Sequence, residues 1–275
     1  MDHPTQNTSL NISLLQHILS SLQINPEVPS ADSLADLVRA YTRKVPWESA
    51  SRIAKRASTQ ETANCPRWPE EFWRDSLERG CGGTCFESNY AFFALLRSLG
   101  YQGYLTINNM GDIAACHTAI ILHLDGRRWL ADVGIPLYAP IPIDERKISR
   151  GQSQFHHYTL KPLGTGVFQV ERDRHPNPYI FTLIDTPIND PKYRRATTRD
   201  YSKDGYFLDR VILNKVIGDQ VWHFNSAERP LHLEEFRAGR RYDHPLDKNI
   251  PALLAGHFGM EIEVLQQALK VVNHF

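Results

Sequence analysis

The spacing of apolar residues changes near residue 100, and this change divides the chain into regions of different predicted structure. Up to that point apolar residues recur every three or four positions, which is typical of amphipathic helices. Ser30 and the acidic pair after Pro69 are also helix-start signals. The pattern therefore predicts helices over residues 10–22 and 30–41, from residue 69, and from residue 85 to about 100.

Between residues 101 and 201 the apolar residues gather in short runs that are rich in β-branched and aromatic side chains. Gly, Pro, Asn and Asp separate the runs, which is typical of short strands and predicts a small barrel or sandwich. The predicted strands are residues 103–107, 117–124, 129–133, 156–160, 166–171 and 179–183. Two further strands, 207–214 and 220–225, precede a final helix at 260–272.

Cys85 is the first residue with candidate chemistry, because it follows Gly82-Gly83-Thr84 and begins a predicted helix. A thiol at a helix start lies beside unpaired N–H groups and the positive end of the helix dipole, and both favour the thiolate. We therefore expect Cys85 to be a nucleophile. A lone cysteine is more often a packing residue, so this hypothesis depends on finding a base and an acid.

His117 and Asp132 are the candidate base and acid, and a short hairpin brings them together. Two apolar strands flank Asp125-Gly126, which is a strong hairpin-turn dipeptide. A turn centred there sets a register in which Asp132 lies within two positions of the residue opposite His117. Local geometry thus predicts this pair, whereas the approach of Cys85 depends on the tertiary fold.

These three residue types suit acyl transfer through a thioester. The imidazole takes the thiol proton, and the carboxylate fixes its tautomer and stabilises the imidazolium. A thiol hydrolase with the same triad would cleave amides without coenzyme A. A binding protein with a silent triad would form no acyl adduct. Both alternatives are open on the residues alone.

The segments around these residues resemble the arylamine N-acetyltransferases, which are thiol acyltransferases that use coenzyme A thioesters. Residues 82–89 (Gly-Gly-Thr-Cys-Phe-Glu-Ser-Asn) are similar to the family's Arg-Gly-Gly-x-Cys segment, and residues 132–134 to its Asp-Val-Gly-Phe-Gly. The candidate base and acid are 15 residues apart, as in the family. Residues 45–49 and 258–262 resemble two outer family segments, so the resemblance covers nearly the whole chain.

The resemblance implies an α+β fold with a papain-like thiol core: a helical bundle over residues 1–100, a β-barrel over 101–203 and an α/β lid over 204–275. It implies ping-pong transfer of an acyl group (acetyl, propionyl or malonyl) from acyl-coenzyme A to an arylamine or another amine. It assigns catalysis to Cys85, His117 and Asp132, cofactor contacts to Gly82, Gly83, Thr84, Thr197 and Thr198, and acceptor contacts to Trp47, Cys116 and Ile135.

The chain departs from the family pattern at two places. Cys81 occupies the position of the family's arginine, which pairs with the glutamate that is Glu87 here. Arg79 is our candidate for the missing charge. Ile135-Pro136 stands where the family has Phe-Gly, so the acceptor is open to amines other than flat aryl amines. Acyl transfer or amide formation in a biosynthetic pathway is therefore a second hypothesis within the same fold.

Other interpretations of the reactive residues are weaker. Cys81, Cys85, Cys116 and His117 do not have a common zinc-ligand spacing, so we expect no metal. A Cys81–Cys85 disulfide would block the nucleophile, and His156-His157 is predicted to be a strand pair. The basic run at residues 192–203 is expected to be a solvated face rather than a phosphate site.

Charge and composition narrow the class of protein. The 31 basic residues equal the 31 acidic residues, which argues against nucleic acid held by net charge. No apolar run approaches the ~20 residues needed to span a bilayer, so no membrane partner is expected. The first residues lack a secretory pattern, and four cysteines do not make a disulfide framework. We therefore expect a cytoplasmic enzyme.

Overall fold

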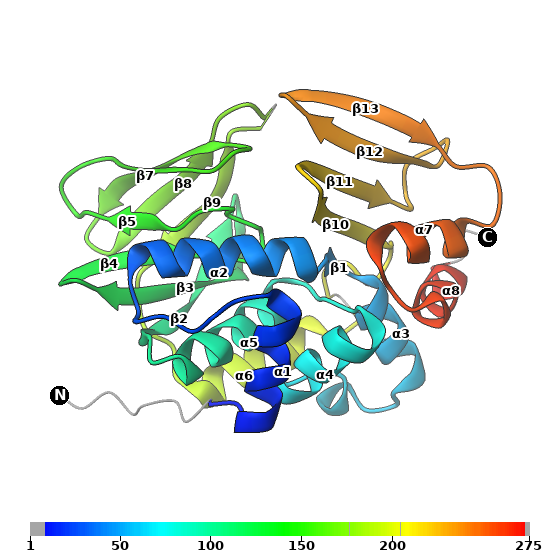
Figure 1. Cartoon of the computed structure of the whole chain (residues 1–275), viewed down its shortest axis with the longest axis horizontal. Coiled ribbons are helices and arrows are strands. Elements are labelled where there is room, and N and C mark those ends of the chain that lie inside the picture. Colours follow the sequence, from blue (N-terminus) through cyan, green and yellow to red (C-terminus); the bar gives the residue numbers. More distant parts are fainter. Residues whose placement is uncertain (1–8, 176, 204, 273–275) are drawn as a thin grey trace.

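The computed structural model describes residues 9–175, 177–203 and 205–272, and Figure 1 shows their arrangement. The helices are α1 (Ile12–Leu22), α2 (Ala31–Lys44), α3 (Ala50–Ser58), η1 (Thr62–Asn64), α4 (Pro69–Arg79), α5 (Cys85–Ser98), α6 (Asp190–Asp200), α7 (Ile250–Phe258) and α8 (Ile262–Val271). The strands are β1 (Trp47–Glu48), β2 (Gln102–Met110), β3 (Ile113–Leu124), β4 (Arg127–Ala131), β5 (Ile141–Ile143), β6 (Ser149–Gln152), β7 (His157–Gly164), β8 (Val167–Arg172), β9 (Tyr179–Ile184), β10 (Ile212–Ile217), β11 (Gln220–Asn225), β12 (His232–Arg237) and β13 (Arg240–Pro245).

The helical layer is built around α5, whose residues from Cys85 to Leu96 are all buried. One side of α5 packs on α4, where the Trp73 indole N–H donates to the Ala91 carbonyl at 2.9 Å. Its other neighbours are β2 and β3, so this helix joins the helical layer to the barrel. A helix with no solvated face needs apolar residues all round, which explains its Phe- and Leu-rich sequence.

The barrel is an eight-stranded antiparallel sheet in the order β5-β4-β3-β2-β9-β8-β7-β6. It is nearly closed, since the two end strands β5 and β6 contact each other. Its interior is filled by apolar side chains, including Ile121, Leu160 and Phe181, none of which is exposed. The sequence prediction of a small barrel is thus confirmed, and so is the α+β fold class.

A separate five-stranded sheet has the order β1-β10-β11-β12-β13, and α7 and α8 pack beside it. Figure 1 shows the barrel on the left and this sheet on the right, both above the helical layer. The short strand β1 comes from the first hundred residues, and α3 from the same region packs on α8. The helical region and the C-terminal region therefore share one apolar cluster.

Several sequence predictions were wrong in detail. Residues 207–214 were predicted to form a strand, but β10 spans Ile212–Ile217, and Phe207 has a positive φ of 59° in the preceding loop. Residues 190–200 form the helix α6, which lies on the helical layer through the buried Tyr193. Helices α3 and α7 and several short strands were not predicted. The short strands have too few apolar positions to show a period, whereas the apolar residues of α3, at positions 50, 53, 54 and 57, do follow helical spacing and were missed.

No helix among the described residues has both the length and the apolar content that a membrane crossing requires.

Candidate active site

Cys85 is the first residue of α5, and its side chain lies between the helical layer and the barrel. Its thiol donates to the carbonyl oxygen of Cys116 in β3, with an Sγ···O distance of 3.7 Å. The Thr118 hydroxyl donates to the Cys85 carbonyl at 3.0 Å. The nucleophile predicted from the sequence is therefore held against the strand segment that carries His117.

The hairpin of β3 and β4 has the predicted register. Ile120 pairs with Ala131 and Leu124 with Arg127, and both turn residues, Asp125 and Gly126, have positive φ as this turn requires. Asp132 follows β4 directly, and its Oδ2 lies 2.5 Å from His117 Nε2. Neither side chain is exposed. The local prediction of a bonded imidazole–carboxylate pair is thus matched by the geometry.

The other ring nitrogen of His117, Nδ1, is buried and has no hydrogen-bond partner among the described residues. The ring packs against Phe181 with centroids 4.6 Å apart, which fixes its plane. A buried polar atom without a partner costs free energy, and a role in proton exchange explains why that cost is kept. Nδ1 is therefore the atom available for proton transfer.

Asn89 connects the three candidate residues, although the sequence analysis did not assign it to the site. Its Nδ2 donates to Asp132 Oδ1 at 2.9 Å and to the Thr118 carbonyl at 2.7 Å. Its Oδ1 accepts from the Val133 N–H at 3.0 Å. Since Asn89 lies one helical turn after Cys85, it fixes the start of α5 to both strands of the hairpin. Asn89 is the last residue of the segment 82–89 that resembles the family, and this resemblance was the signal that could have assigned it to the site.

Asp132 is also held by its own loop, because Oδ1 accepts the N–H groups of Gly134 at 2.7 Å and Ile135 at 3.1 Å. Gly134 has no room for a side chain: a Cβ there would lie 2.5 Å from the Cα of Cys85. The glycine of the Asp-Val-Gly segment is therefore required by the close approach of the nucleophile's backbone.

The pKa of Cys85 departs from the expectation drawn from the sequence. Burial raises the pKa of the thiol well above its usual value, the carboxylates of Asp200 and Asp132 raise it further, and Arg52 lowers it. The helix start does leave its N–H groups available, since Thr84 makes no side-chain cap. In the buried site, however, the desolvation of the thiolate is the larger effect. Cys85 therefore needs a base next to it.

The partner of Glu87 is Arg67, and the proposal of Arg79 was wrong. Arg67 Nη2 lies 2.7 Å from Glu87 Oε2 and donates to the Gly82 carbonyl at 2.6 Å. Both side chains are buried. Arg79 instead pairs with Glu261 and is 41% exposed. Because Arg67 lies well before the glycine-rich segment in the sequence, only the tertiary fold could identify it.

Arg67 and Glu48 hold the glycine-rich segment from opposite sides. The Gly82 N–H donates to Glu48 Oε1 at 3.1 Å, and a Cβ at Gly82 would lie 1.7 Å from the Pro46 carbonyl oxygen. The Gly82 N–H is therefore already used. The neighbouring Thr84 hydroxyl accepts from Arg52 at 3.4 Å, so Thr84 too has a structural contact.

Two of the residues that were predicted to contact the cofactor, Thr197 and Thr198, lie on α6. Thr197 is buried in α6 and its hydroxyl donates to the Tyr193 carbonyl at 3.0 Å, and Thr198 is half-buried on the same helix. The basic run at residues 192–203 lies mostly within α6, whose last residue, Asp200, pairs with Arg52 at 2.7 Å. The hydrogen bond from α6 to the start of α5 is made by the Tyr193 hydroxyl, which donates to the Phe86 carbonyl at 2.8 Å. The Asp200 carboxylate acts on the thiol through its charge.

The predicted acceptor residues lie on segments that adjoin the candidate catalytic residues. Trp47 is half-buried, forms a β-bridge with Gly83, and has an indole Nε1 without a partner among the described residues. Ile135 is half-buried beside Asp132. Cys116 is half-buried, and its Sγ turns to the Ile113 carbonyl at the open start of β3.

The cysteines do not form a disulfide or a metal cluster in the described part of the chain. All four are free thiols, and Cys81 belongs to the C-terminal apolar cluster while Cys85 belongs to that of the helical layer. The candidate metal-ligand group found in this part is Glu228, His232 and Glu234. Arg241 lies 3.0 Å from Glu234 and 3.9 Å from Glu228, so both carboxylates of this group already pair with a cation of the chain.

Many solved structures are similar to this chain, among them three arylamine N-acetyltransferases. An arylamine N-acetyltransferase from Salmonella typhimurium is 15% identical, with a TM-score of 0.81 over 97% of this chain and 100% of that chain. The Mycobacterium marinum enzyme, solved in complex with CoA, is 19% identical, with a TM-score of 0.79 over 94% and 99%. The Mycobacterium abscessus enzyme is 21% identical, with a TM-score of 0.73 over 94% of each chain.

The TM-scores show that the chain shares the fold of these enzymes, and at such low sequence identity the likeness shows the fold alone. No curated protein matches the chain. The profile of a family described as N-acetyltransferase matches residues 30–267, which is most of the sequence. The chain therefore belongs to this N-acetyltransferase family, and it is an acyltransferase enzyme with the fold of the arylamine N-acetyltransferases.

Proposed function

We propose that the protein transfers an acyl group from acyl-coenzyme A to an amine through a thioester on Cys85. One observation carries this proposal: the 2.5 Å pair of His117 and Asp132 is buried beside the strand residue that contacts the Cys85 sulfur. The Mycobacterium marinum relative was solved with CoA, which supports a coenzyme A thioester as the donor.

In the first half-reaction, Cys85 loses its proton to His117 Nδ1 as its sulfur attacks the carbonyl carbon of the donor thioester. A tetrahedral intermediate forms. Its collapse breaks the bond to the sulfur of coenzyme A, which takes the proton from the imidazolium and leaves. Because burial raises the pKa of the Cys85 thiol, this transfer to the adjacent imidazole makes the attack possible near neutral pH.

In the second half-reaction, the amine attacks the acyl carbon of the Cys85 thioester. His117 Nδ1 takes a proton from the amine nitrogen, the carbon–sulfur bond breaks, and the proton returns to the Cys85 sulfur. The products are the amide and the starting enzyme. Asp132 keeps the proton of His117 on Nε2, so that Nδ1 stays the acceptor in both steps.

The negative charge that develops on the carbonyl oxygen needs a donor. The start of α5 supplies backbone N–H groups that no Thr84 side-chain cap uses, together with the positive end of the helix dipole. The Gly82 N–H is bonded to Glu48, so it does not serve this purpose. We infer that the first turn of α5, and not the glycine pair, stabilises the oxyanion.

Intact-mass spectrometry tests the proposal directly. The wild-type protein mixed with acetyl-, propionyl- or malonyl-coenzyme A should gain one acyl group, which is about 42 Da for acetyl, and lose it when an amine is added. Cys85→Ala should gain nothing. Cys81→Ala and Cys116→Ala are matched controls that should still be acylated, because neither sulfur is placed beside the imidazole–carboxylate pair.

The same experiment separates the other classes of function. If water removes the acyl group from Cys85 as fast as an amine does, the protein is a hydrolase. Absence of an adduct with every donor would refute thioester transfer from coenzyme A. A series of amine acceptors then tests the effect of the half-buried Ile135. We expect the enzyme to use non-aromatic amines as well as aryl amines.

A further inference from the structure

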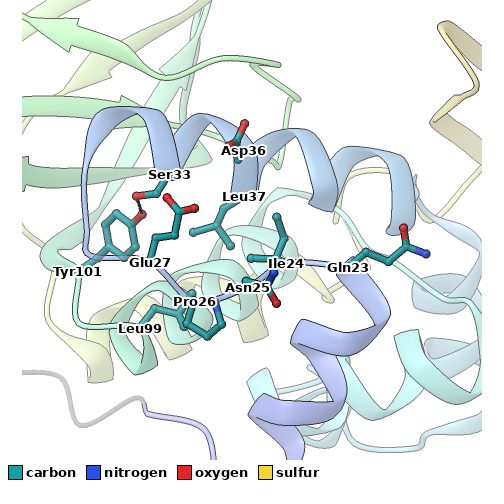
Figure 2. A pocket seen from close by; sticks show the side chains of 10 residues that line it. All are labelled: Gln23, Ile24, Asn25, Pro26, Glu27, Ser33, Asp36, Leu37, Leu99 and Tyr101. Carbon is teal, nitrogen blue, oxygen red and sulfur yellow. Dashed lines mark hydrogen bonds between the residues drawn. The ribbon is translucent and has the colours of Figure 1, made fainter.

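Buried polar groups near the C-terminal end of α5 satisfy one another, as the hollow in Figure 2 shows. This hollow measures about 130 Å³ and lies between Tyr101 and the segment joining α1 to α2. The hydroxyl oxygens of Ser33 and Tyr101 are 2.7 Å apart, so these two groups bind each other. The hollow is too small for a substrate, and its central polar groups need no ligand.

The start of α5 differs, because a buried ion pair lies there that the proposed mechanism does not use. Arg52, from α3, lies 2.7 Å from the carboxylate of Asp200, the last residue of α6. The Arg52 side chain has no exposed surface, and that of Asp200 is 10% exposed. Replacing such a buried pair by apolar residues is often neutral or even stabilising, because desolvation of the two charges offsets their attraction. The stability of the fold therefore does not explain why the pair is present.

The end of α6 fixes the guanidinium of Arg52 by three contacts. Nη1 binds the Asp200 carboxylate, Nη2 donates to the Asp200 carbonyl oxygen, and the guanidinium carbon lies 4.2 Å from the centre of the Tyr201 ring. The Tyr201 hydroxyl in turn donates to Glu87 Oε1 at 2.5 Å. These contacts hold the positive charge in one position against the first turn of α5.

That position adjoins the candidate nucleophile. Arg52 Nη1 also donates to the hydroxyl oxygen of Thr84 at 3.4 Å, and Thr84 directly precedes Cys85. The Arg52 charge lowers the pKa of the Cys85 thiol, whereas the Asp200 carboxylate raises it. The two members of one ion pair thus act on the sulfur with opposite sign.

The other titratable groups around the thiol are paired or uncharged. They are the bonded pair of His117 and Asp132 on the hairpin, the Cys116 thiol on β3, and the pair of Glu87 and Arg67 at the glycine-rich segment. Burial raises the pKa of Cys116, so that thiol is uncharged near pH 7. Among the described groups that shift the pKa of Cys85 most, the cation is Arg52.

We propose that Arg52 is a positioning residue for the reaction at Cys85: held in place by Asp200, its guanidinium supplies a fixed positive charge that stabilises negative charge on the sulfur. Asp200 orients the guanidinium and offsets part of this stabilisation. The catalytic consequence rests on the proposed function, whereas the effect of the charge on the sulfur does not depend on the donor.

The opposite signs distinguish this role from a structural one. Arg52→Gln and Asp200→Asn break the same ion pair, so a merely structural role predicts that both variants change the reactivity of the thiol in the same direction. A role for the charge predicts that the Cys85 thiolate forms less readily in Arg52→Gln and more readily in Asp200→Asn.

The measurement is the rate of iodoacetamide alkylation at pH 9, followed by mass mapping of the Cys85 peptide, in a His117→Ala background where no imidazole takes the proton. A change of one unit in the thiol pKa changes the thiolate fraction about tenfold, and the change in nucleophilicity offsets about threefold of this. Asp200→Asn should therefore react about threefold faster or more, and Arg52→Gln about threefold slower or more. Arg52→Lys keeps the charge, so its rate should lie closer to that of the parent protein than to that of Arg52→Gln.

The matched control is Lys55→Gln, which removes an equal charge from the same helix. Lys55 pairs with Glu71 at 2.6 Å, and both side chains are partly exposed, so the alkylation rate should change less than about 1.5-fold. Melting temperatures identify the variants that fold, and if Arg52→Gln does not fold, the sign of the change in Asp200→Asn decides. An unchanged or slower alkylation in Asp200→Asn would overturn the inference, as would shifts of the same sign in both variants.

Acylation by acetyl-coenzyme A, in proteins that keep His117, connects the charge to the reaction. Arg52→Gln should lower the maximal acylation rate about threefold or more and leave the half-saturating donor concentration unchanged, because the charge acts on the sulfur and not on the bound donor. An unchanged maximal rate would also contradict the inference. If the wild type forms no acyl adduct with any donor, the proposed function fails, whereas the alkylation rates still test the Arg52 charge.

Discussion

Replacing Arg67 by methionine removes the charge that holds the glycine-rich segment while keeping most of the side-chain volume. In the wild type, the guanidinium lies 2.7 Å from Glu87 Oε2 and 2.6 Å from the Gly82 carbonyl oxygen, and its exposed fraction is 1%. The Glu87 carboxylate has no exposed surface. Arg67→Met therefore leaves the Glu87 carboxylate buried without its cation. Its remaining hydrogen bonds come from the backbone N–H of residue 67 and from the Tyr201 hydroxyl.

Breaking one side of a buried ion pair costs about 3–5 kcal/mol, because the other charge stays buried without compensation. For a chain of this size, 3 kcal/mol corresponds to a fall in melting temperature of roughly 6–12 °C. Cys85 lies between Gly82 and Glu87, so its position also changes. A misplacement of about 1 Å at a reacting group can cost on the order of 100-fold in rate.

The assay is equilibrium unfolding of Arg67→Met, Glu87→Gln and the double variant, together with the rate of acylation by acetyl-coenzyme A. The double variant should be more stable than the sum of the single losses predicts, by about 1 kcal/mol or more, because both removed charges belong to one pair. The matched control is Arg79→Met. Its ion pair with Glu261 is 41% and 36% exposed, so it should cost less than about 1 kcal/mol.

A larger loss of stability or activity in Arg79→Met than in Arg67→Met would refute the reasoning. It would mean that the residue close in sequence, and not the residue buried against Glu87, supplies the charge. Additive losses in the double variant would equally show that Arg67 and Glu87 act independently.

Four further outcomes are expected. His117→Ala should lower the acylation rate ~10³-fold or more, and a stopped-flow rate above a tenth of wild type would contradict its role as base. In that variant, iodoacetamide alkylation of Cys85 should keep rising beyond pH 9, because burial raises the thiol pKa and no imidazole takes the proton; a plateau below pH 8 would oppose this. Gly134→Ala should destabilise the fold by at least ~2 kcal/mol in urea, since its Cβ would lie 2.5 Å from the Cys85 Cα, and wild-type stability would contradict the close approach. Lys215→Met should stabilise below pH 8, because burial lowers the Lys215 pKa to about 8 and the folded chain binds that proton more weakly than the unfolded chain; the gain should shrink as pH rises towards 10, and a pH-independent difference would refute it.

Local elements of the site could be predicted because their geometry depends on near neighbours. The pairing of Leu124 with Arg127 follows from the Asp-Gly turn, and it places His117 and Asp132 on adjacent strands whatever the rest of the chain does. The helix that begins at Cys85 was likewise indicated by its glycine-rich approach and its apolar run.

The errors occur where packing between distant segments decides the structure. Residues 190–200 have a polar, basic sequence that resembles a solvated segment, yet the buried Tyr193 and Thr197 attach them to the helical layer as α6. Helix α3 has few apolar residues and is buried by α8, more than two hundred residues away. The apolar residues of α3 do recur at helical spacing, at positions 50, 53, 54 and 57, so its helical form could have been predicted. Its burial by α8 could not.

The amino-acid sequence determined the hairpin, the change from helices to strands near residue 100, and the choice of Cys85, His117 and Asp132 as the candidate thiol, imidazole and carboxylate. The tertiary structure decided the partner of Glu87, which is Arg67, and the direction in which the pKa of Cys85 moves. The physical reason is that turn geometry and strand register act over a few residues. Desolvation and charge pairing instead depend on which distant groups surround a buried atom, and only the folded chain specifies those.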